Sequence, residues 1–347
     1  MAAAAPLALA WRFAHVYRTR AGYPHPVAPT SDPSDLGLAF ETWSVKTPDG
    51  LELPAWWIPA GPTPAPAVVL VHGWESARHR TLPNAQFLHA LGFHVLTVDI
   101  RGHGLNAAET MPVSAGEFGT DALAAVEAAL ADERVTQVAV LGHSMGSIGA
   151  ILAAAAEPRV AAAVLTATPA DPYRLTRQTF RLARLPIPDA IAYPLAWLTT
   201  RVYLQPRGHT VDAISASTAI RRYRGPILAI HGTEDRVVPF GHLARLVAAV
   251  RTARANDPDA APVEELVIAG GQHSWLYEFP AYRAAIGHFL AAGFGGPLSP
   301  DEAARIAERV DARRPVEPDH EFSAISRAPL IGEPAVVGIL ATPAAHH

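Results

Sequence analysis

The sequence predicts an α/β protein with a mostly parallel central sheet, helices on both faces and an inserted helical cap. Short apolar runs alternate with helical segments, which is typical of a parallel sheet covered on both sides. One segment, 170–225, separates two apolar runs and is far longer than an ordinary connection. Polar motifs follow the apolar runs, at the strand ends where such sheets collect their chemistry.

The first predicted elements form a β-hairpin. Segments 41–46 and 51–58 alternate partially between apolar and polar residues around the turn Thr47-Pro48-Asp49-Gly50. Further strands are expected at 67–71, 93–98, 138–141, 160–165, 227–230 and 266–269. Helices are expected at 82–91, 116–132, 243–250 and 282–290, and in the alanine-rich segment that ends at 156.

The interruptions of this alternation divide the chain. The predicted parts are an N-terminal extension (1–37), an α/β core (38–169 and 226–292), a helical cap (170–225) and a C-terminal tail (293–347). The cap is expected to hold helices at 173–185 and 189–204. In the tail the sequence predicts one helix, with Ser299 as N-cap, Pro300 at its first position and Glu302 completing a capping box. Poor order is expected beyond Pro315.

Composition excludes several function classes. The net charge of −4 over 347 residues argues against a general nucleic-acid binder. The absence of cysteine excludes disulfides, a cysteine nucleophile and thiolate metal sites. Because the histidines also lack metal-ligand spacings, no metal and no cofactor is expected.

The beginning of the chain is apolar but does not predict a signal peptide. It lacks a basic leading region and an evident cleavage site, and no apolar run in the sequence is long enough to span a bilayer. A cytoplasmic location is expected. Peripheral membrane association through the apolar N-terminus is the alternative.

The stretch 138–156 carries the central motif, Gly142-His143-Ser144-Met145-Gly146. An apolar strand precedes it and an alanine-rich helix follows, so the serine is expected at a sharp strand-to-helix turn. Glycine is required two residues before and two residues after Ser144, because a side chain there would collide with the neighbouring strand or helix. The helix N-terminus favours negative charge developing at the serine. Ser144 is therefore the candidate nucleophile.

A serine nucleophile needs a base, and the base needs an orienting acid. His273 follows the strand 266–269 and Asp235 follows the strand 227–230, in the chain order acid then histidine. We expect His273 to accept the Ser144 proton and Asp235 to hold the imidazole. The adjacent Glu234, and Asp171 after the strand 160–165, are the alternative acids.

The oxyanion of an acyl-transfer intermediate needs two fixed N–H donors. The backbone N–H groups of Met145 and Trp74 are predicted for this role, because Met145 follows the nucleophile and Trp74 ends the strand that leads into His72-Gly73. His72 and His143 are expected to be structural, and Asp99 and His103 to form a turn.

These motifs resemble the α/β-hydrolase family over residues 38–292. The resemblance rests on His72-Gly73-Trp74, on the segment 99–104, on the serine turn, and on the loops with Asp235 and His273. The chain is most similar to the esterase, lipase and serine-aminopeptidase-like branch, in which the cap lies between the sixth and seventh strands. The resemblance implies the α/β-hydrolase fold and hydrolysis through Ser144, Asp235 and His273.

Hydrolysis of a carboxylic ester through an acyl-serine is the favoured function. A peptidase that removes an N-terminal residue would hold the substrate ammonium with cap carboxylates, and this cap has no glutamate and few aspartates. Thioesterase, acyltransferase and cofactor-free peroxidase activities remain open, as does a non-catalytic binding module, against which the intact motifs argue. Lyase chemistry of the hydroxynitrile type lacks a nearby lysine, and dehalogenases and epoxide hydrolases use aspartate at the serine position. A small ester or acyl compound is the expected partner.

The cap segment 170–225 contains nine arginines, three aspartates and no glutamate. A solvated arginine-rich face is the favoured interpretation, and an anionic substrate or membrane surface is the alternative. Seven apolar cap residues are candidates for an acyl pocket: Phe180, Leu182, Leu185, Ile191, Leu195, Leu198 and Val202. Packing of the cap on the core is the other interpretation for at least half of them.

Overall fold

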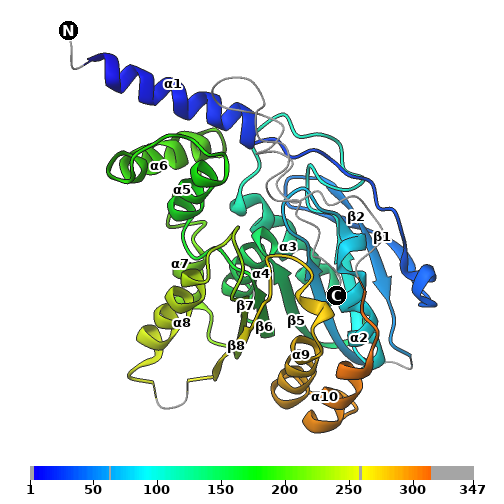
Figure 1. The fold of residues 1–347 in the computed structure, drawn as a ribbon. Coiled ribbons are helices and arrows are strands. Elements are labelled where there is room, and N and C mark those ends of the chain that lie inside the picture. The colour runs from blue at the N-terminus through cyan, green and yellow to red at the C-terminus, as the bar shows by residue number, and fades with distance from the viewer. Residues whose placement is uncertain (1–3, 62–63, 258–259, 314–347) are drawn as a thin grey trace, which may run out of the picture.

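The structure is a computed structural model that describes residues 4–61, 64–257 and 260–313. Its centre is an eight-stranded sheet in the order β1-β2-β4-β3-β5-β6-β7-β8 (Figure 1). The strands are β1 (Glu41–Lys46), β2 (Glu52–Ile58), β3 (Ala65–Val71), β4 (His94–Val98), β5 (Val135–His143), β6 (Val160–Thr166), β7 (Ile227–Gly232) and β8 (Val263–Ile268). Each strand that the sequence predicts is present, with ends shifted by a few residues.

The sheet is antiparallel only at the edge formed by β1 and β2. All pairs from β4 to β8 are parallel, so their carboxyl ends meet at one edge of the sheet. The register brings Val71 of β3 beside Gly142 of β5, and His143 of β5 beside Thr166 of β6. The loop after β3 and the turn after β5 therefore start side by side.

The helices confirm the predicted layers. The α-helices are α1 (Ala4–Ala21), α2 (Leu82–Ala90), α3 (Ala115–Leu130), α4 (Met145–Ala156), α5 (Pro172–Leu182), α6 (Asp189–Leu204), α7 (Ala216–Arg222), α8 (Gly241–Arg254), α9 (Pro280–Gly293) and α10 (Pro300–Arg309). Short 3-10 helices are η1 (Pro33–Leu36), η2 (Arg78–Thr81), η3 (Gln205–Arg207) and η4 (Leu276–Glu278).

The two faces of the sheet form two separate cores. Alternate residues of each inner strand point to opposite sides. Val69 and Val140 join the core that α3, α4, α7 and α8 cover, whereas Val68 and Ala139 join the core beneath α2, α9 and α10. Double coverage explains why these strands are apolar throughout.

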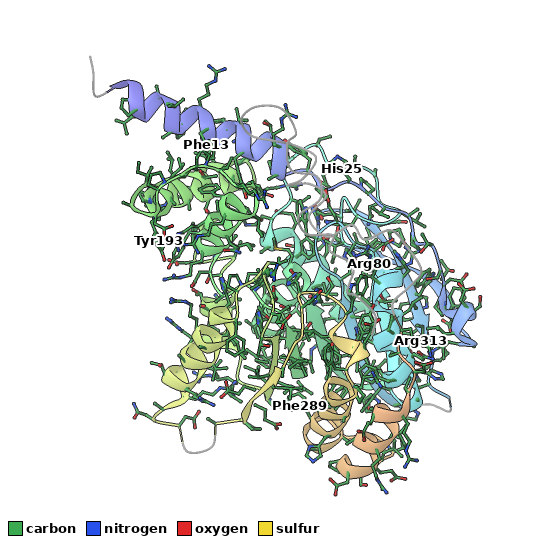
Figure 2. The ribbon with its side chains drawn as sticks, viewed as in Figure 1. Phe13, His25, Arg80, Tyr193, Phe289 and Arg313 are labelled. Carbon is green, nitrogen blue, oxygen red and sulfur yellow. The ribbon has the colours of Figure 1, made fainter. Side chains whose placement is uncertain are left out.

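The cap consists of α5 and α6, and the N-terminal segment adds a helix to it. The sequence analysis treats residues 1–37 as an extension and does not predict α1. In the structure α1 packs along α6 (Figure 1). Phe13 lies on the side of α1 that faces the cap, and its ring meets that of Phe180 at 5.4 Å between centroids (Figure 2). Tyr17 contacts the same ring at 5.7 Å, so one buried cap residue ties the N-terminus to the insertion.

Two further features differ from the sequence-based expectations. Helix α7, inside the segment expected as cap, packs against α4 and α8 and places Ala219 and Ile220 in the main core. Helix α10 begins after Ser299 as predicted, but the Ser299 side chain makes no capping hydrogen bond, so the predicted capping box is absent. The expectation of poor order beyond Pro315 concerns residues outside the described ranges.

Candidate active site

Ser144 occupies the turn between β5 and α4 with strained backbone angles, φ 53° and ψ −119°. Residues with side chains rarely adopt a positive φ, and such strain persists where the surroundings enforce it. A Cβ atom on Gly142 would lie 2.4 Å from the carbonyl oxygen of Gly146. One on Gly146 would lie 2.2 Å from the carbonyl oxygen of His72. The two glycines of the motif therefore stand where a side chain cannot fit.

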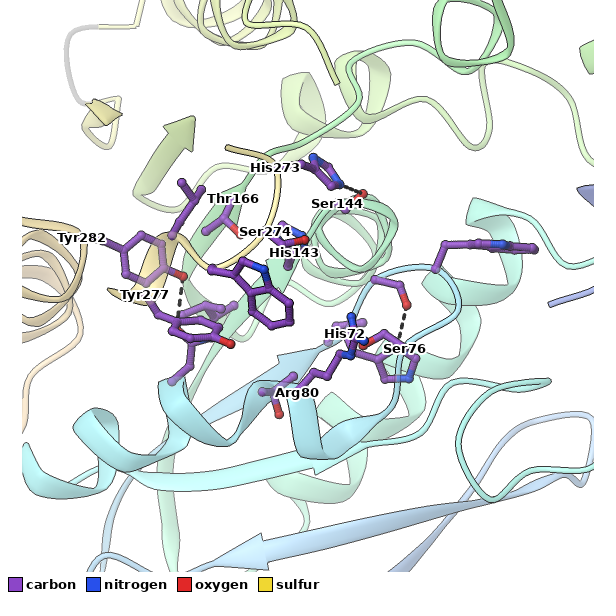
Figure 3. A pocket seen from close by; sticks show the side chains of 18 of the residues that line it. His72, Ser76, Arg80, His143, Ser144, Thr166, His273, Ser274, Tyr277 and Tyr282 are labelled. Atoms are coloured by element: carbon purple, nitrogen blue, oxygen red, sulfur yellow. Dashed lines mark hydrogen bonds between the residues drawn. The ribbon is translucent and has the colours of Figure 1, made fainter. Parts of the chain in front are cut away.

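The structure brings His273 and Asp235 to Ser144 in the expected order. Nε2 of His273 lies 3.0 Å from Oγ of Ser144 (Figure 3). Nδ1 of the same ring lies 2.8 Å from Oδ2 of Asp235, whose side chain is fully buried. The hydrogen-bonded chain therefore runs from carboxylate through imidazole to hydroxyl, with the residues supplied by the ends of β7, β8 and β5.

Asp235 is held as a carboxylate by its own loop. The backbone N–H groups of Val237 and Val238 donate to Oδ1 at 2.9 and 2.8 Å. His231 lies with Nε2 3.2 Å from Oδ2. Burial alone would raise the pKa of Asp235, but its charge interaction with His273 and the hydrogen bonds from both histidines outweigh burial and lower that pKa below the ordinary value.

Neither alternative acid takes the place of Asp235. Glu234 is exposed beside it. Asp171 lies at the start of α5, where its carboxylate pairs with Arg174 at 3.2 Å. The carboxylate that contacts the imidazole of His273 is therefore that of Asp235.

The loop after β3 lies against the serine. A Cβ atom on Gly73 would come within 3.5 Å of the Cβ of Ser144, so the backbone of this loop and the nucleophile are in close approach. His72 braces the loop, because its Nε2 accepts from the N–H of Ile100 at 3.0 Å and its Nδ1 lies 2.7 Å from the carbonyl oxygen of Gly73. Trp74 is half-buried at the same point. Its N–H and that of Met145 remain predicted oxyanion donors.

Asp99 holds the loop after β3 in place through hydrogen bonds. It accepts hydrogen bonds from the backbone and guanidinium of Arg78 and from the N–H of Leu105. Gly104 has φ +57°, and a Cβ atom there would fall on the Asp99 carboxylate. The segment 99–104 is therefore a buried turn, in agreement with the structural role that the sequence suggests for it.

His143 lies beside the site and stays neutral. Its ring centroid is 4.9 Å from that of His273, and its Nδ1 lies 3.2 Å from the hydroxyl of Thr166. Burial, followed by the charge interaction with His273, lowers the pKa of His143 to about 3. A neutral ring here avoids a second positive charge beside the imidazole that must take up a proton.

An apolar pocket opens on one side of Ser144. Its walls come from α4, the cap and α1, and include Ile148, Leu175, Tyr203, Leu204 and Tyr17. None of the seven apolar cap residues named from the sequence belongs to its lining. They lie on other faces of α5 and α6 and on the link between these helices, as Phe180 does where it packs against α1. Tyr17 was missed because its contact with the pocket depends on how α1 packs on the cap.

A second, more polar pocket also includes Ser144 in its lining (Figure 3). Arg80, Glu75, Trp275 and Tyr277 line it, and the sequence analysis named none of them for the site. The guanidinium of Arg80 lies 5.3 Å from the Trp275 ring centroid. Trp275 lies two residues after His273 and has φ 66°. No sequence pattern indicates this backbone conformation, so the place of Trp275 in the pocket could not be predicted.

Metal-ligating groups do not cluster in the part of the chain that the structure describes: no set of three or more histidine, aspartate or glutamate side chains is placed to hold an ion. The same residues contain no helix that is both long enough and apolar enough to cross a bilayer.

The sheet order, the serine turn and the strand-end residues define the class: the chain belongs to the α/β-hydrolase superfamily. The model of the serine aminopeptidase family S33 matches residues 62–205. An uncharacterized protein of Mycobacterium tuberculosis, Rv2307c, is 30% identical over 233 residues, which are 66% of this chain and 71% of that protein. Human protein ABHD12B is 28% identical over 235 residues, which are 65% of this chain and 60% of that protein.

Solved structures agree on the fold. The esterase Pf2001 of Pyrococcus furiosus matches with a TM-score of 0.63 at 22% identity, covering 79% of this chain and 97% of the esterase. Structures of this fold include both esterases and peptidases. The chain thus shares its fold with both esterases and peptidases.

Proposed function

We propose that the protein hydrolyses carboxylic esters through an acyl-serine intermediate. The observation that carries the proposal is the position of Ser144: its Oγ lies 3.0 Å from Nε2 of His273, and it belongs to the lining of both an apolar and a more polar pocket. An ester has an acyl chain on one side of its carbonyl carbon and an alcohol on the other, so two pockets that meet at the nucleophile fit its two halves.

Acylation begins when His273 takes the proton of Ser144 as Oγ attacks the ester carbonyl. The negative charge on the carbonyl oxygen is stabilised by the N–H groups of Trp74 and Met145 and by the N-terminus of α4. The tetrahedral intermediate collapses as the C–O bond to the alcohol breaks, and His273 gives its proton to the departing oxygen. Asp235, ionised throughout, holds the imidazole and stabilises the imidazolium.

Deacylation repeats these steps with water. His273 takes a proton from the water that attacks the acyl carbon, the bond to Oγ breaks, and the proton returns to Ser144. The acid product and the free serine remain. The same donors serve the second oxyanion, so the site needs no further group.

The acyl chain is assigned to the apolar pocket. Leu175, Ile148 and Leu204 offer it hydrocarbon contacts, and binding a chain there removes apolar surface from water on both sides. The alcohol is assigned to the pocket with Arg80 and Trp275.

Removal of an N-terminal residue from a peptide is the second candidate, and the match to the serine aminopeptidase family favours it. Such an enzyme holds the substrate ammonium with carboxylates. Among the residues that the structure describes, Glu75 is the sole acidic residue that lines either pocket. One of its oxygens lies 2.8 Å from Nδ1 of His25 and 3.2 Å from the His25 backbone nitrogen. A carboxylate engaged in this way is less suited to an ammonium group, which favours the ester.

The test is a panel of acyl esters of graded chain length beside aminoacyl anilides and acyl thioesters. We expect ester turnover to exceed anilide turnover, and Ser144→Ala to remove the ester activity. Anilide turnover above ester turnover favours the peptidase instead. A preference for thioesters assigns the same chemistry to a thioesterase.

A further inference from the structure

The first turns of α1 expose an apolar surface that the cap does not cover. Leu7 and Leu9 are 72% and 69% exposed, and Trp11 is 48% exposed. Further along the helix the side chains of Ala14 and Tyr17 are buried against the cap. The helix therefore begins as an apolar projection and ends as part of the folded molecule (Figure 1).

Helix α6, which packs beside α1, exposes apolar and aromatic groups of its own. Ile191 is 55% and Trp197 is 49% exposed. The Arg201 guanidinium lies 3.7 Å from the Trp197 ring centroid, and that of Arg177 lies 4.1 Å from the ring of Tyr193. Exposed tryptophan and tyrosine beside arginine are typical of groups that meet the boundary between lipid headgroups and acyl chains.

The charge of the three helices α1, α5 and α6 is strongly one-sided. Asp189 is their single acidic residue, and it is shared by Arg177 and Arg181 at 2.8 and 3.1 Å. Arg12 and Arg20 are exposed on α1, which has no acidic residue among Ala4–Ala21. The excess of arginine complements an anionic surface.

We propose that these exposed groups of α1 and α6 form one surface and that this surface docks on an anionic lipid bilayer. We call it the α1–α6 surface and define it by the exposed side chains of Leu7, Leu9, Trp11, Ile191 and Trp197. The apolar groups enter the headgroup region, and the surrounding arginines contact lipid phosphates. The lipid is favoured by charge complementarity: α1, α5 and α6 carry one acidic residue among several arginines, and two of these arginines lie against exposed aromatic rings of α6.

Docking also gives the apolar pocket a source of substrate, a consequence that rests on the proposed function. Tyr17 and Ala21 of α1 line that pocket, together with Thr179 and Thr200 of the cap. The helix whose first turns enter the lipid is therefore also a wall of the pocket. Esters with long acyl chains, which reside in bilayers, are the class of substrate that this arrangement suits.

The experiment is co-sedimentation of the full chain with vesicles of phosphatidylcholine alone or with one third phosphatidylglycerol. We expect binding to the anionic vesicles at least tenfold stronger than to the neutral ones, and weaker in high salt because surface charges are screened. The variant Leu7→Ser/Leu9→Ser/Trp11→Ser should reduce anionic-vesicle binding about tenfold or more. Trp197→Ser should reduce it as well.

Matched controls are exposed residues elsewhere. Val267→Ser removes an exposed apolar group on β8, and Arg221→Ala/Arg222→Ala removes two exposed charges on α7. Both should bind vesicles like the wild type, and all variants should keep the wild-type melting temperature. Vesicle binding does not depend on turnover, so its outcome is independent of the proposed ester hydrolysis.

Three outcomes overturn the proposal: no vesicle binding, equal binding to neutral and anionic vesicles, or binding that the α1 variant leaves unchanged. Self-association of the wild type, lost in the α1 variant and without vesicle binding, identifies the surface as a protein interface instead.

Discussion

At the scale of single residues, the site separates groups that must change protonation from groups that must not. Asp235 is fixed as an anion by two backbone N–H groups and two histidines. His143 is kept neutral by its surroundings. His273 lies between a carboxylate and the hydroxyl of Ser144, which is the position that a proton carrier needs.

Asp235→Asn should lower kcat for an ester about 10³- to 10⁴-fold, because an amide neither selects the required tautomer of His273 nor stabilises its cation. Steady-state kinetics measure the effect. The matched controls are Glu234→Gln, at the exposed neighbour, and Asp171→Asn, at the other candidate acid; both should stay within a few-fold of wild type. A loss of less than tenfold for Asp235→Asn contradicts the assigned role.

The ester activity should rise once between about pH 6 and pH 8, because only a neutral imidazole accepts the Ser144 proton. Asp235, with its lowered pKa, is ionised over this range, and His143, with a pKa of about 3, is neutral over it. Neither group therefore adds a second step to the pH profile of the activity. The measurement is log(kcat/KM) against pH, with an expected slope of one on the acid side. A flat profile excludes His273 as the base.

The close approach of Ser144, Asp235 and His273 could be predicted from the sequence, because each residue follows an apolar strand and parallel strands bring their carboxyl ends together. The partners that tune them were less accessible. His231 and Val238 contact Asp235 through the fold of one loop, and Arg80 and Trp275 reach the polar pocket from separate elements. The spacing of these residues along the sequence does not predict such contacts.

At the scale of elements, the β5–α4 turn is determined by local sequence, whereas the cap is determined by packing between distant segments. The turn is fixed locally, since Gly142 and Gly146 leave space that a Cβ atom would fill. The pocket depends on packing between α1, α5 and α6, where an apolar side chain can be buried against any of several neighbouring elements. Sequence patterns located α5 and α6 but did not identify the side of each helix that faces Ser144.

Leu175→Trp should shorten the acyl chains that the enzyme accepts, because the larger ring fills part of the apolar pocket. We expect kcat/KM for an octanoyl ester to fall at least tenfold while that for an acetyl ester changes less than threefold. Leu182→Trp, on the same helix but outside the pocket lining, is the matched control. Equal losses on both esters would show that the pocket does not hold the acyl chain.

Helix α1 shows why the N-terminal segment was not predicted as structure. Its first residues are apolar without a periodic pattern, and its contacts, such as Tyr17 Oη to Thr179 Oγ1 at 2.7 Å, span 162 residues of chain. Arg18 and Arg20 near its end suit the helix dipole, a weak signal by itself. Long-range packing, rather than local propensity, determines that this helix is part of the cap.

At the scale of the whole molecule, buried histidines link stability to pH. His72, His103 and His143 have pKa values lowered to about 4, 3 and 3, with burial as the largest cause in each case. An unfolded histidine takes up its proton near pH 6.5. Below that pH the unfolded state therefore binds more protons than the folded state, and the free energy of unfolding falls as the pH falls.

We expect the free energy of unfolding to decrease steadily from pH 7.5 to pH 5, with up to about 1.4 kcal/mol per pH unit from each histidine that is protonated only when unfolded. Urea denaturation at several pH values measures it. His103→Asn should reduce the slope against pH by about one proton, whatever its effect on stability at pH 7.5. Equal or greater stability at pH 5 would contradict the burial of neutral histidines.

The central claim is that Ser144 is a nucleophile activated by His273, and labelling with a fluorophosphonate tests it most directly. We predict that the wild type gains one phosphonyl group, that mass spectrometry of its peptides places the group on Ser144, and that Ser144→Ala gains none. Absence of labelling in the wild type, or a label on another residue that persists in Ser144→Ala, would contradict the account.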